Sequence, residues 1–157
     1  MLNRRQPLLR LADGLPCPRI ATSGDADARL MADPSRVPIR CLIVDDNPLF
    51  LEGATDLLER EGLEVVGVAS TSAEAIPLVR ELRPDVILVD VFLGDEDGFE
   101  LARKLRDASA AHSQVILIST HAEDDLAQLI AVSPAVGFVS KARVSAQAIR
   151  EMLERAA

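Results

Sequence analysis

The residue types best suited to chemistry stand directly after short apolar runs in the 157-residue sequence. They are the acids Asp45, Asp46 and Asp90, the hydroxyls of Ser119 and Thr120, and the amine of Lys141. A short apolar run bounded by turn residues is typical of a buried strand in a parallel sheet. Because the carboxyl ends of parallel strands lie at one edge of the sheet, we expect these side chains to meet there.

This set of side chains predicts a site for phosphoryl transfer. Three carboxylates a few ångström apart repel one another, by roughly 4 kcal/mol for each close pair at an effective dielectric constant of about 20. A cation or a bound proton relieves that repulsion, and an all-oxygen site with open water positions suits Mg²⁺. With a lysine and a hydroxyl beside it, a carboxylate nucleophile can accept a phosphoryl group. The predicted product is an aspartyl phosphate.

Five apolar runs alternate with five amphipathic segments, and this alternation would position the site. The strands are expected at residues 39–44, 65–69, 86–89, 115–118 and 136–139. The pattern predicts an α/β fold in which a five-stranded parallel sheet is doubly wound, with helices on both of its faces.

Helix boundaries follow from capping residues and from the spacing of apolar side chains. Asn47 and Pro48 should begin the first helix, since Asn is a good cap and Pro suits the first turn. Thr71 or Ser72 should cap the second helix. In the fourth helix the residues expected to face the core are Leu126, Leu129 and Ile130.

Composition and charge restrict the class of protein. The sequence has no Trp or Tyr and only four Phe, so its core must be aliphatic. Residues 39–157 carry 11 basic and 21 acidic side chains, which argues against direct nucleic-acid binding. No apolar run is long enough to span a membrane, no signal-peptide core is present, and Cys17 and Cys41 lack the spacing of a disulfide framework. These features favour a cytoplasmic protein that does not bind membranes.

Residues 1–38 differ from the rest of the sequence. They hold five prolines, six arginines and four aspartates without sustained periodicity, so we interpret them as a disordered extension before a single domain at residues 39–157. Residues 2–11 could form a short amphipathic docking peptide. Alternatively, translation begins at Met31. The sequence favours neither alternative.

Four motifs carry a resemblance to a known family. They are LIVDDNP (42–48), ILVDVFLGDEDGFEL (87–101), VILIST (115–120) and GFVSK (137–141). In this order and spacing they resemble the receiver domain of two-component response regulators, which has a flavodoxin- or CheY-like (βα)5 fold. The resemblance spans about three-quarters of the chain, and its opening motif is closest to the NarL-type subgroup.

The resemblance implies a role for each residue of the site. Asp90 would be the phosphoacceptor, and Ser119 and Lys141 would contact the phosphoryl group. The Mg²⁺ ligands would be Asp45, Asp46, Asp90 and the backbone carbonyl of Phe92.

The resemblance also implies how such a protein signals. Phe138 would be the aromatic that turns inward on activation, while Phe92 and His121 would tune the lifetime of the phosphoryl group. That group would come from a sensor histidine kinase or a phosphotransfer protein. A downstream target protein would bind the activated form, and a phosphorylation-dependent homodimer is compatible with the family. We expect signalling through protein contacts, without an output domain and without enzymatic activity beyond the protein's own phosphorylation and dephosphorylation.

Three residues depart from the family pattern. Gly94 stands where the loop after the phosphoacceptor usually has Pro, which predicts a more mobile loop. Ala142 replaces the Pro that usually follows the lysine; that peptide is often cis in the family, and a cis bond before Ala would cost a few kcal/mol. Ser119 replaces the commoner Thr and keeps the hydroxyl.

Three other functions compete with this interpretation. A phosphatase or phosphotransferase with an Asp nucleophile usually needs a second acid two residues later, where this sequence has Phe92. A pseudo-receiver that is never phosphorylated is disfavoured by the intact acids and by Lys141. A dinucleotide-binding module is disfavoured because no Gly-rich loop follows the first expected strand.

Overall fold

The computed structural model describes residues 37–110 and 112–156. The chain divides into two units, residues 1–33 and 34–157, and the described residues all belong to the second. The expectations for residues 1–36, namely a disordered extension, a docking peptide and an alternative start at Met31, lie outside the described residues.

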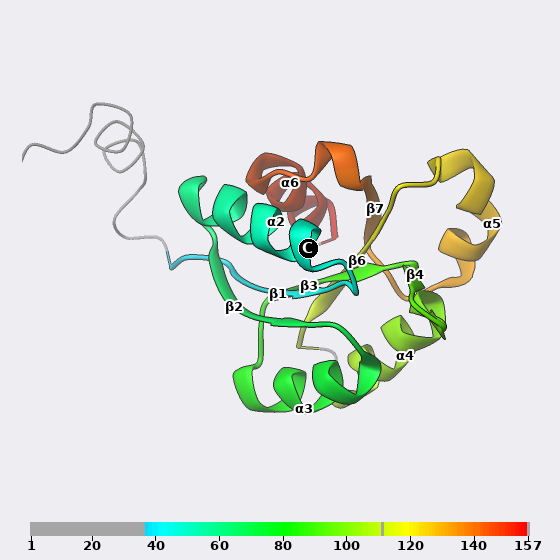
Figure 1. Cartoon of the computed structure of the whole chain (residues 1–157), viewed down its shortest axis with the longest axis horizontal. Helices are drawn as coiled ribbons and strands as arrows, with labels where there is room; N and C mark the ends of the chain where they lie inside the picture. Colours follow the sequence, from blue (N-terminus) through cyan, green and yellow to red (C-terminus); the bar gives the residue numbers. More distant parts are fainter. Residues whose placement is uncertain (1–36, 111, 157) are drawn as a thin grey trace, which may run out of the picture. The chain divides into compact units, whose positions relative to one another are not determined.

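A five-stranded parallel sheet forms the centre of the described unit (Figure 1). Its strands stand in the order β2-β1-β3-β6-β7. The bounds are β1 (Arg40–Val44), β2 (Glu64–Ala69), β3 (Val86–Asp90), β6 (Gln114–Ser119) and β7 (Gly137–Ser140). All four neighbouring pairs are parallel. The predicted doubly wound (βα)5 fold is therefore confirmed.

Helices cover both faces of the sheet. They are α2 (Pro48–Arg60), α3 (Ser72–Leu82), α4 (Gly98–Ala108), α5 (Glu123–Val132) and α6 (Ala146–Ala156), with a short 3-10 helix, η1 (Lys141–Arg143), after β7. Figure 1 shows α2 and α6 on one face and α3 and α4 on the other. Leu126, the buried residue of α5, joins the same core cluster as the buried residues of α3 and α4.

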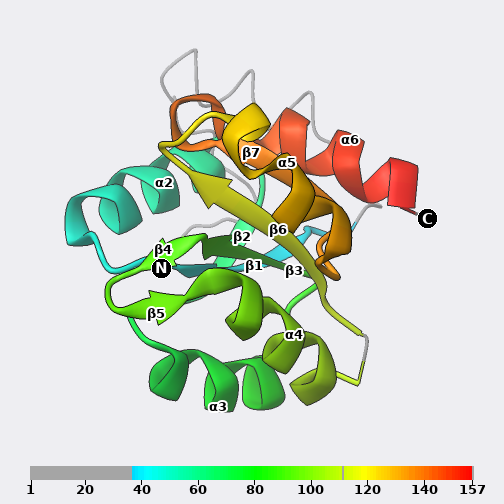
Figure 2. The ribbon, with the colours of Figure 1, turned by 90° about the vertical axis from the view of Figure 1, so that its right-hand side faces the viewer.

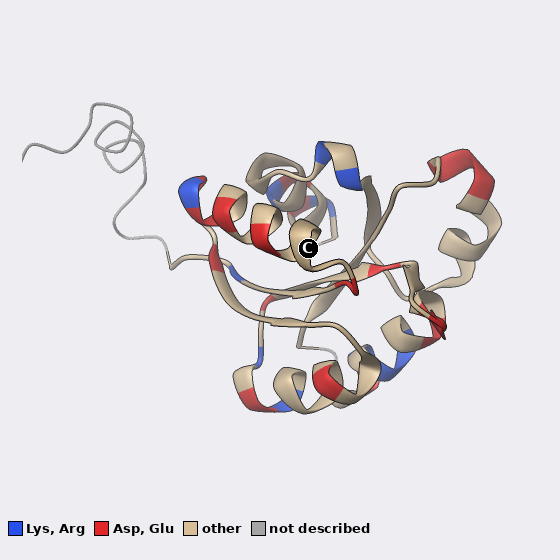
Figure 3. Ribbon diagram, viewed as in Figure 1, with Lys and Arg blue, Asp and Glu red and all other residues tan. Residues whose placement is uncertain are grey.

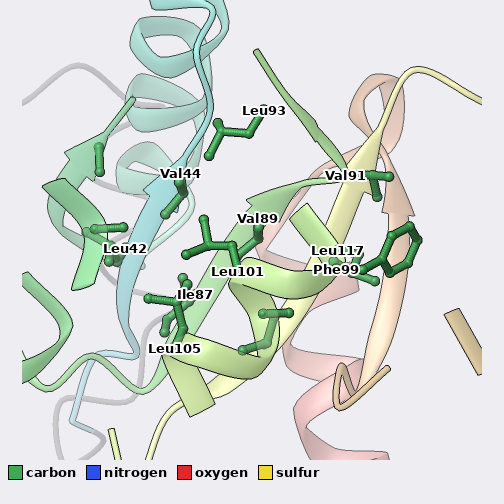
Figure 4. Close-up of a cluster of buried hydrophobic side chains, with 14 of the residues drawn as sticks. Leu42, Val44, Ile87, Val89, Val91, Leu93, Phe99, Leu101, Leu105 and Leu117 are labelled. Atoms are coloured by element: carbon green, nitrogen blue, oxygen red, sulfur yellow. The ribbon is translucent and has the colours of Figure 1, made fainter. Parts of the chain in front are cut away.

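Alternate residues of the strands supply two separate cores. Leu42 and Val44 of β1 point to the cluster beneath α3 and α4, which Figure 4 shows in close-up. Cys41 and Ile43 point to the cluster beneath α2 and α6. Because both faces of the sheet are covered, its central strands are apolar at every position rather than at every second one. This explains why the sequence shows continuous apolar runs.

The predicted helix caps are present at the first two helices. The Asn47 side chain accepts hydrogen bonds from the backbone N–H groups of Leu49, at 3.0 Å, and Phe50, at 3.4 Å. Thr71, rather than Ser72, caps α3, because its Oγ1 accepts from the N–H of Glu74 at 3.2 Å. These bonds satisfy N–H groups that have no partner within the helix.

One prediction about α5 is wrong. Leu126 is buried and Ile130 packs against the core, but Leu129 is 52% exposed. The helix lies over β7, which is an edge strand of the sheet, so only a narrow apolar stripe of α5 contacts the core. Leu129 stands outside that stripe.

A small hairpin follows β3 and was not expected from the sequence. It pairs β4 (Phe92–Leu93) with β5 (Glu96–Asp97), which lie side by side in Figure 2. Gly94 turns the hairpin at φ +59°, a conformation that glycine adopts without strain. Gly98 then brings the chain back against β3, since an added Cβ would stand 2.1 Å from the carbonyl oxygen of Asp90. The hairpin is thereby held directly beside Asp90.

No helix within residues 37–110 and 112–156 combines the length and the apolar character that crossing a membrane requires.

Candidate functional site

Three aspartates converge at the carboxyl ends of β1 and β3. Val44 pairs with Val89 in the parallel register, so the residues that follow them, Asp45 and Asp90, become neighbours. Asp46 joins them from the next position of the chain, and one carboxylate oxygen of each aspartate lies within 4.8 Å of the others. Figure 3 shows the acidic residues of the loop after β1 and of the end of β3 close together. The structure therefore brings together the three predicted acids.

Local hydrogen bonds fix the buried Asp45. Its backbone N–H donates to the carbonyl of Ala69 at 2.9 Å, which extends the sheet by one residue. Its Oδ1 accepts from the N–H of Asn47 at 2.8 Å. Asn47 in turn caps α2, so one short turn both orients the carboxylate and begins the helix.

Lys141 links two of the three acids. Its Nζ lies 2.6 Å from Asp45 Oδ2 and 3.1 Å from Asp90 Oδ2, and its side chain is only 14% exposed. Burial disfavours the charged ammonium, but the hydrogen bonds that it donates to Asp45 and Asp90, and the attraction of their negative charges, outweigh burial and raise the pKa of Lys141. Lys141 is therefore a fixed positive charge at neutral pH.

The surroundings of Asp90 disfavour its charged form, whereas those of Lys141 favour the charged form. Burial raises the pKa of its carboxyl group, and repulsion from Asp45 adds to the rise. The hydrogen bonds from Lys141 and from the N–H of Phe92 lower that pKa without cancelling the rise. Lys141 is closer to Asp45 than to Asp90, so Asp90 receives the smaller share of its charge. An oxygen nucleophile that is short of compensating charge is suited to binding a cation and to reacting with an electrophile.

Lys141 reaches this position without a cis peptide. All peptide bonds in the described residues are trans. Lys141 begins η1, and the Oγ of Ser140 accepts from the N–H of Ala142 at 3.3 Å. The replacement of the usual Pro by Ala142 therefore leaves the lysine between the two acids.

Ser119, Phe92 and His121 form a second group beside the acids. The buried Ser119 Oγ accepts from the N–H of His121 at 3.0 Å and lies 3.4 Å from His121 Nδ1. The rings of Phe92 and His121 are in contact, with centroids 4.6 Å apart. Phe92 also donates its N–H to Asp90 Oδ1 at 3.1 Å, while its side chain is 49% exposed. The two residues expected to tune phosphoryl lifetime therefore touch each other.

Two further predicted residues lie on the side of β6 and β7. Phe138 is 8% exposed and packs inward, in the core cluster that includes Leu126 of α5. Thr120, after Ser119, is exposed. The structure thus places Phe138 in the core and Thr120 at the surface.

Sequence reasoning missed two contacts of the site. Lys141 Nζ lies 4.8 Å from the centroid of the Phe50 ring. Glu96, in the loop after Asp90, accepts hydrogen bonds from the N–H of Ser72 at 2.8 Å and from its Oγ at 2.7 Å. These bonds lower the pKa of Glu96. Both contacts join residues far apart in the sequence, so no local sequence pattern predicts them.

Comparisons with known proteins agree with the geometry. The sequence profile of the response regulator receiver domain matches residues 41–154. The response regulator GacA of Pseudomonas aeruginosa is 36% identical over 118 residues, which are 73% of this chain and 55% of the relative. The chain thus spans about half the length of this curated relative.

Solved structures give the same result. The receiver domain of the putative response regulator NarL from Mycobacterium tuberculosis has a TM-score of 0.66 at 30% identity, over 77% of this chain and 98% of that one. A response regulator from Burkholderia pseudomallei, solved with a phosphorylated aspartic acid, a calcium ion and citrate, has a TM-score of 0.63 at 25% identity. That match covers 73% of this chain and 65% of the other.

Proposed function

Because the chain belongs to the response regulator receiver domain family, we propose that Asp90 accepts a phosphoryl group from a phosphohistidine of a sensor histidine kinase or phosphotransfer protein. The observation that carries this proposal is the cluster of three carboxylates within 4.8 Å with Lys141 between two of them. A histidine-bound phosphoryl group is the donor chemistry expected for this family. The Burkholderia relative, with its phosphorylated aspartic acid, supports the same chemistry here.

The donor set fits a divalent cation that prefers oxygen. Asp45 Oδ2 is buried, and the Lys141 ammonium, 2.6 Å away, is its one charged partner among the described residues. Three carboxylates also outnumber the single ammonium beside them. Asp45, Asp46, Asp90 and the carbonyl of Phe92 would hold Mg²⁺, as hard oxygen ligands do. When bound, the ion would neutralise negative charge on the phosphoryl oxygens.

The protein's own residues would perform the transfer by position and charge. A carboxylate oxygen of Asp90 attacks phosphorus as the bond from phosphorus to the donor nitrogen breaks. Lys141 then pairs with a phosphoryl oxygen in place of Asp90 Oδ2. The Ser119 hydroxyl donates to another phosphoryl oxygen and so turns away from His121 Nδ1, while its Oγ can still accept from the N–H of His121.

Signalling would follow from that rearrangement. The phosphoryl group adds negative charge at Asp90, and movement of Ser119 would change the space available to Phe138. We propose that a downstream target protein, or a second copy of the chain, binds the altered surface over β6, β7 and α6. Phe92 and His121 would cover Asp90 and slow attack by water.

A phosphatase with an Asp nucleophile is less well supported. The position two residues after Asp90, where such an enzyme usually has its general acid, holds Phe92, whose ring contacts His121. A pseudo-receiver is also less well supported, because Lys141 and all three acids occupy one site.

The test is the intact mass of the protein after incubation with Mg²⁺ and acetyl phosphate. We expect the wild type to gain one phosphoryl group and the Asp90→Asn variant to gain none. Addition of EDTA should abolish the gain in the wild type. An unchanged mass of the wild type, together with no binding of Mg²⁺, would contradict the proposal and favour a pseudo-receiver.

A further inference from the structure

Phe50 contacts the lysine of the site with the face of its aromatic ring. The Nζ of Lys141 lies 4.8 Å from the centroid of the Phe50 ring, within the distance at which an ammonium is attracted to the face of an aromatic ring. The same Nζ contacts Asp45 and Asp90. The ammonium thus has two anionic partners and one aromatic partner.

The ring is held in place by the beginning of α2. Phe50 is half-buried and packs against the core cluster beneath α2 and α6. Its N–H donates to Asn47 Oδ1 at 3.4 Å, and the N–H of Asn47 donates to Asp45 Oδ1 at 2.8 Å. The backbone that carries the ring and the Asp45 carboxylate are therefore linked through one short turn.

Ligands of the site would compete with Lys141 for its two acidic partners but not for its aromatic partner. In the proposed function, a divalent cation and the phosphoryl group take up oxygens of Asp45 and Asp90 that Lys141 contacts in this structure. Neither of them competes for the face of a neutral ring. A lysine side chain has four flexible carbons and loses rotamer entropy whenever it is fixed. A contact that persists while the anionic contacts change would keep the ammonium near its new partner.

We propose that Phe50 is a positioning residue that holds the Lys141 ammonium at the site through the face of its ring. This inference rests on the proposed phosphorylation of Asp90. Phe50 itself touches neither the phosphoryl donor nor the reacting oxygen. Its effect on the reaction acts through Lys141.

The first test is spectroscopic and uses a favourable feature of the sequence, which contains only two lysines, Lys104 and Lys141. In protein labelled with ¹³C and ¹⁵N at lysine, the ring of Phe50 should displace the Lys141 Cε–H resonances relative to those of Lys104. Lys104 lies on α4, exposed and 3.8 Å from Glu100, and serves as the internal reference. Phe50→Leu should remove the displacement, and Phe50→Tyr should keep it. Coincident lysine resonances in the wild type would overturn the proposal.

The second test is the rate of phosphorylation by acetyl phosphate at saturating Mg²⁺. Phe50→Leu fills much of the same space without a ring and should react about three to ten times more slowly. Phe50→Tyr should react at nearly the wild-type rate. Leu49→Ala is the matched control, because Leu49 is the adjacent residue of α2 and is 77% exposed.

The outcomes separate this inference from the proposed function. A wild-type protein that gains no phosphoryl group contradicts the proposed function. An active wild type whose Phe50→Leu variant reacts equally fast overturns the positioning role alone. Equal slowing of the Leu and Tyr variants also overturns it, because Tyr keeps the ring.

Discussion

Similar polar residues have different roles at the two edges of the sheet, the amino edge, where the parallel strands begin, and the carboxyl edge, where they end. Each of three strands, β1, β3 and β6, has a polar residue at both ends. At the amino edge these are Arg40, Asp85 and Ser113, and at the carboxyl edge they are Asp45, Asp90 and Ser119. The first set supports the fold, whereas the second set forms the candidate site.

At the amino edge the polar groups are paired within the protein. Arg40 donates to the carbonyl of Leu82 at 2.6 Å, which satisfies the end of α3, and its N–H donates to Asp85 Oδ2 at 2.9 Å. The buried Ser113 Oγ donates to the carbonyl of Pro84 at 2.6 Å. Such pairing leaves little for an incoming ligand to bind.

At the carboxyl edge the charges do not balance. Asp45 and Asp90 are buried and in contact with the Lys141 ammonium, and Asp46 adds a third carboxylate. Burial and Asp45 together raise the pKa of Asp90. The difference shows how a site that binds a cation and a phosphoryl group can be recognised. Its buried charges are not fully neutralised by other groups of the protein, whereas polar residues alone do not mark such a site.

Replacement of Lys141 should have the largest effect on both stability and phosphorylation. In Mg²⁺-free buffer, Lys141→Met leaves two buried acids unpaired and should lower the free energy of unfolding by about 3 kcal/mol. It should also slow phosphorylation by roughly a hundredfold, because a fixed positive charge is lost from the phosphoryl oxygens. Urea titration and intact mass measure these effects. Lys104→Met is the control, and equal effects of the two substitutions would contradict the account.

Two buried serines, Ser113 at the amino edge and Ser119 at the carboxyl edge, should differ in their effects on stability and on phosphorylation. Ser113→Ala removes the donor to the Pro84 carbonyl and should cost about 1–3 kcal/mol of stability without changing the phosphorylation rate. Ser119→Ala should cost less stability but slow phosphorylation about five- to tenfold, the value of one hydrogen bond. Thermal unfolding and mass-detected kinetics on both variants give the answer. A slower reaction in Ser113→Ala would mean that the two edges are not separate in function.

The aromatic pair at the carboxyl edge predicts a smaller effect. Phe92→Asn removes the ring that contacts His121 and should admit water to the phosphorylated Asp90, so the phosphoryl half-life should fall severalfold. Loss of mass with time after removal of the donor measures that half-life. Leu129→Asn is a matched control, since Leu129 is 52% exposed and Phe92 49%. An unchanged half-life in Phe92→Asn would discard the idea that the ring excludes water.

The smallest expected effect concerns the hairpin next to Asp90. Because hydrogen bonds from Ser72 lower the pKa of Glu96 in the folded protein, its contribution to stability is present above the ordinary pKa near 4.5. The contribution is lost as the pH falls through the lower, folded-state pKa. Glu96→Gln should therefore reduce stability at pH 7 by less than about 1 kcal/mol, since the pair is exposed. At pH values below that folded-state pKa its unfolding midpoint should approach that of the wild type, and a difference that persists there would contradict this assignment.

The sequence was sufficient to predict the sheet and the placement of most of the site. Continuous apolar runs marked the strands, and the common direction of parallel strands placed Asp45, Asp90 and Lys141 at one edge. The structure agrees because strand register depends on buried residues that are close in sequence to the acids.

The remaining features depend on contacts that have no local signature. Phe50 and Lys141 are separated by most of the domain, and Glu96 meets Ser72 across 24 residues. Leu129 was wrongly assigned to the core because its helical spacing from Leu126 does not reveal that α5 covers an edge strand. Side-chain periodicity predicts which face of a helix is apolar, but it does not predict how much of that face the sheet covers.

The most direct test of the central claim is to locate the phosphoryl group within the chain. Borohydride reduces an aspartyl phosphate to homoserine, so peptide mapping after reaction with acetyl phosphate and Mg²⁺ identifies the acceptor residue. We expect homoserine at position 90 and none at positions 45 or 46. Homoserine at another aspartate, or none in a wild-type protein that has gained the mass of a phosphoryl group, would contradict it.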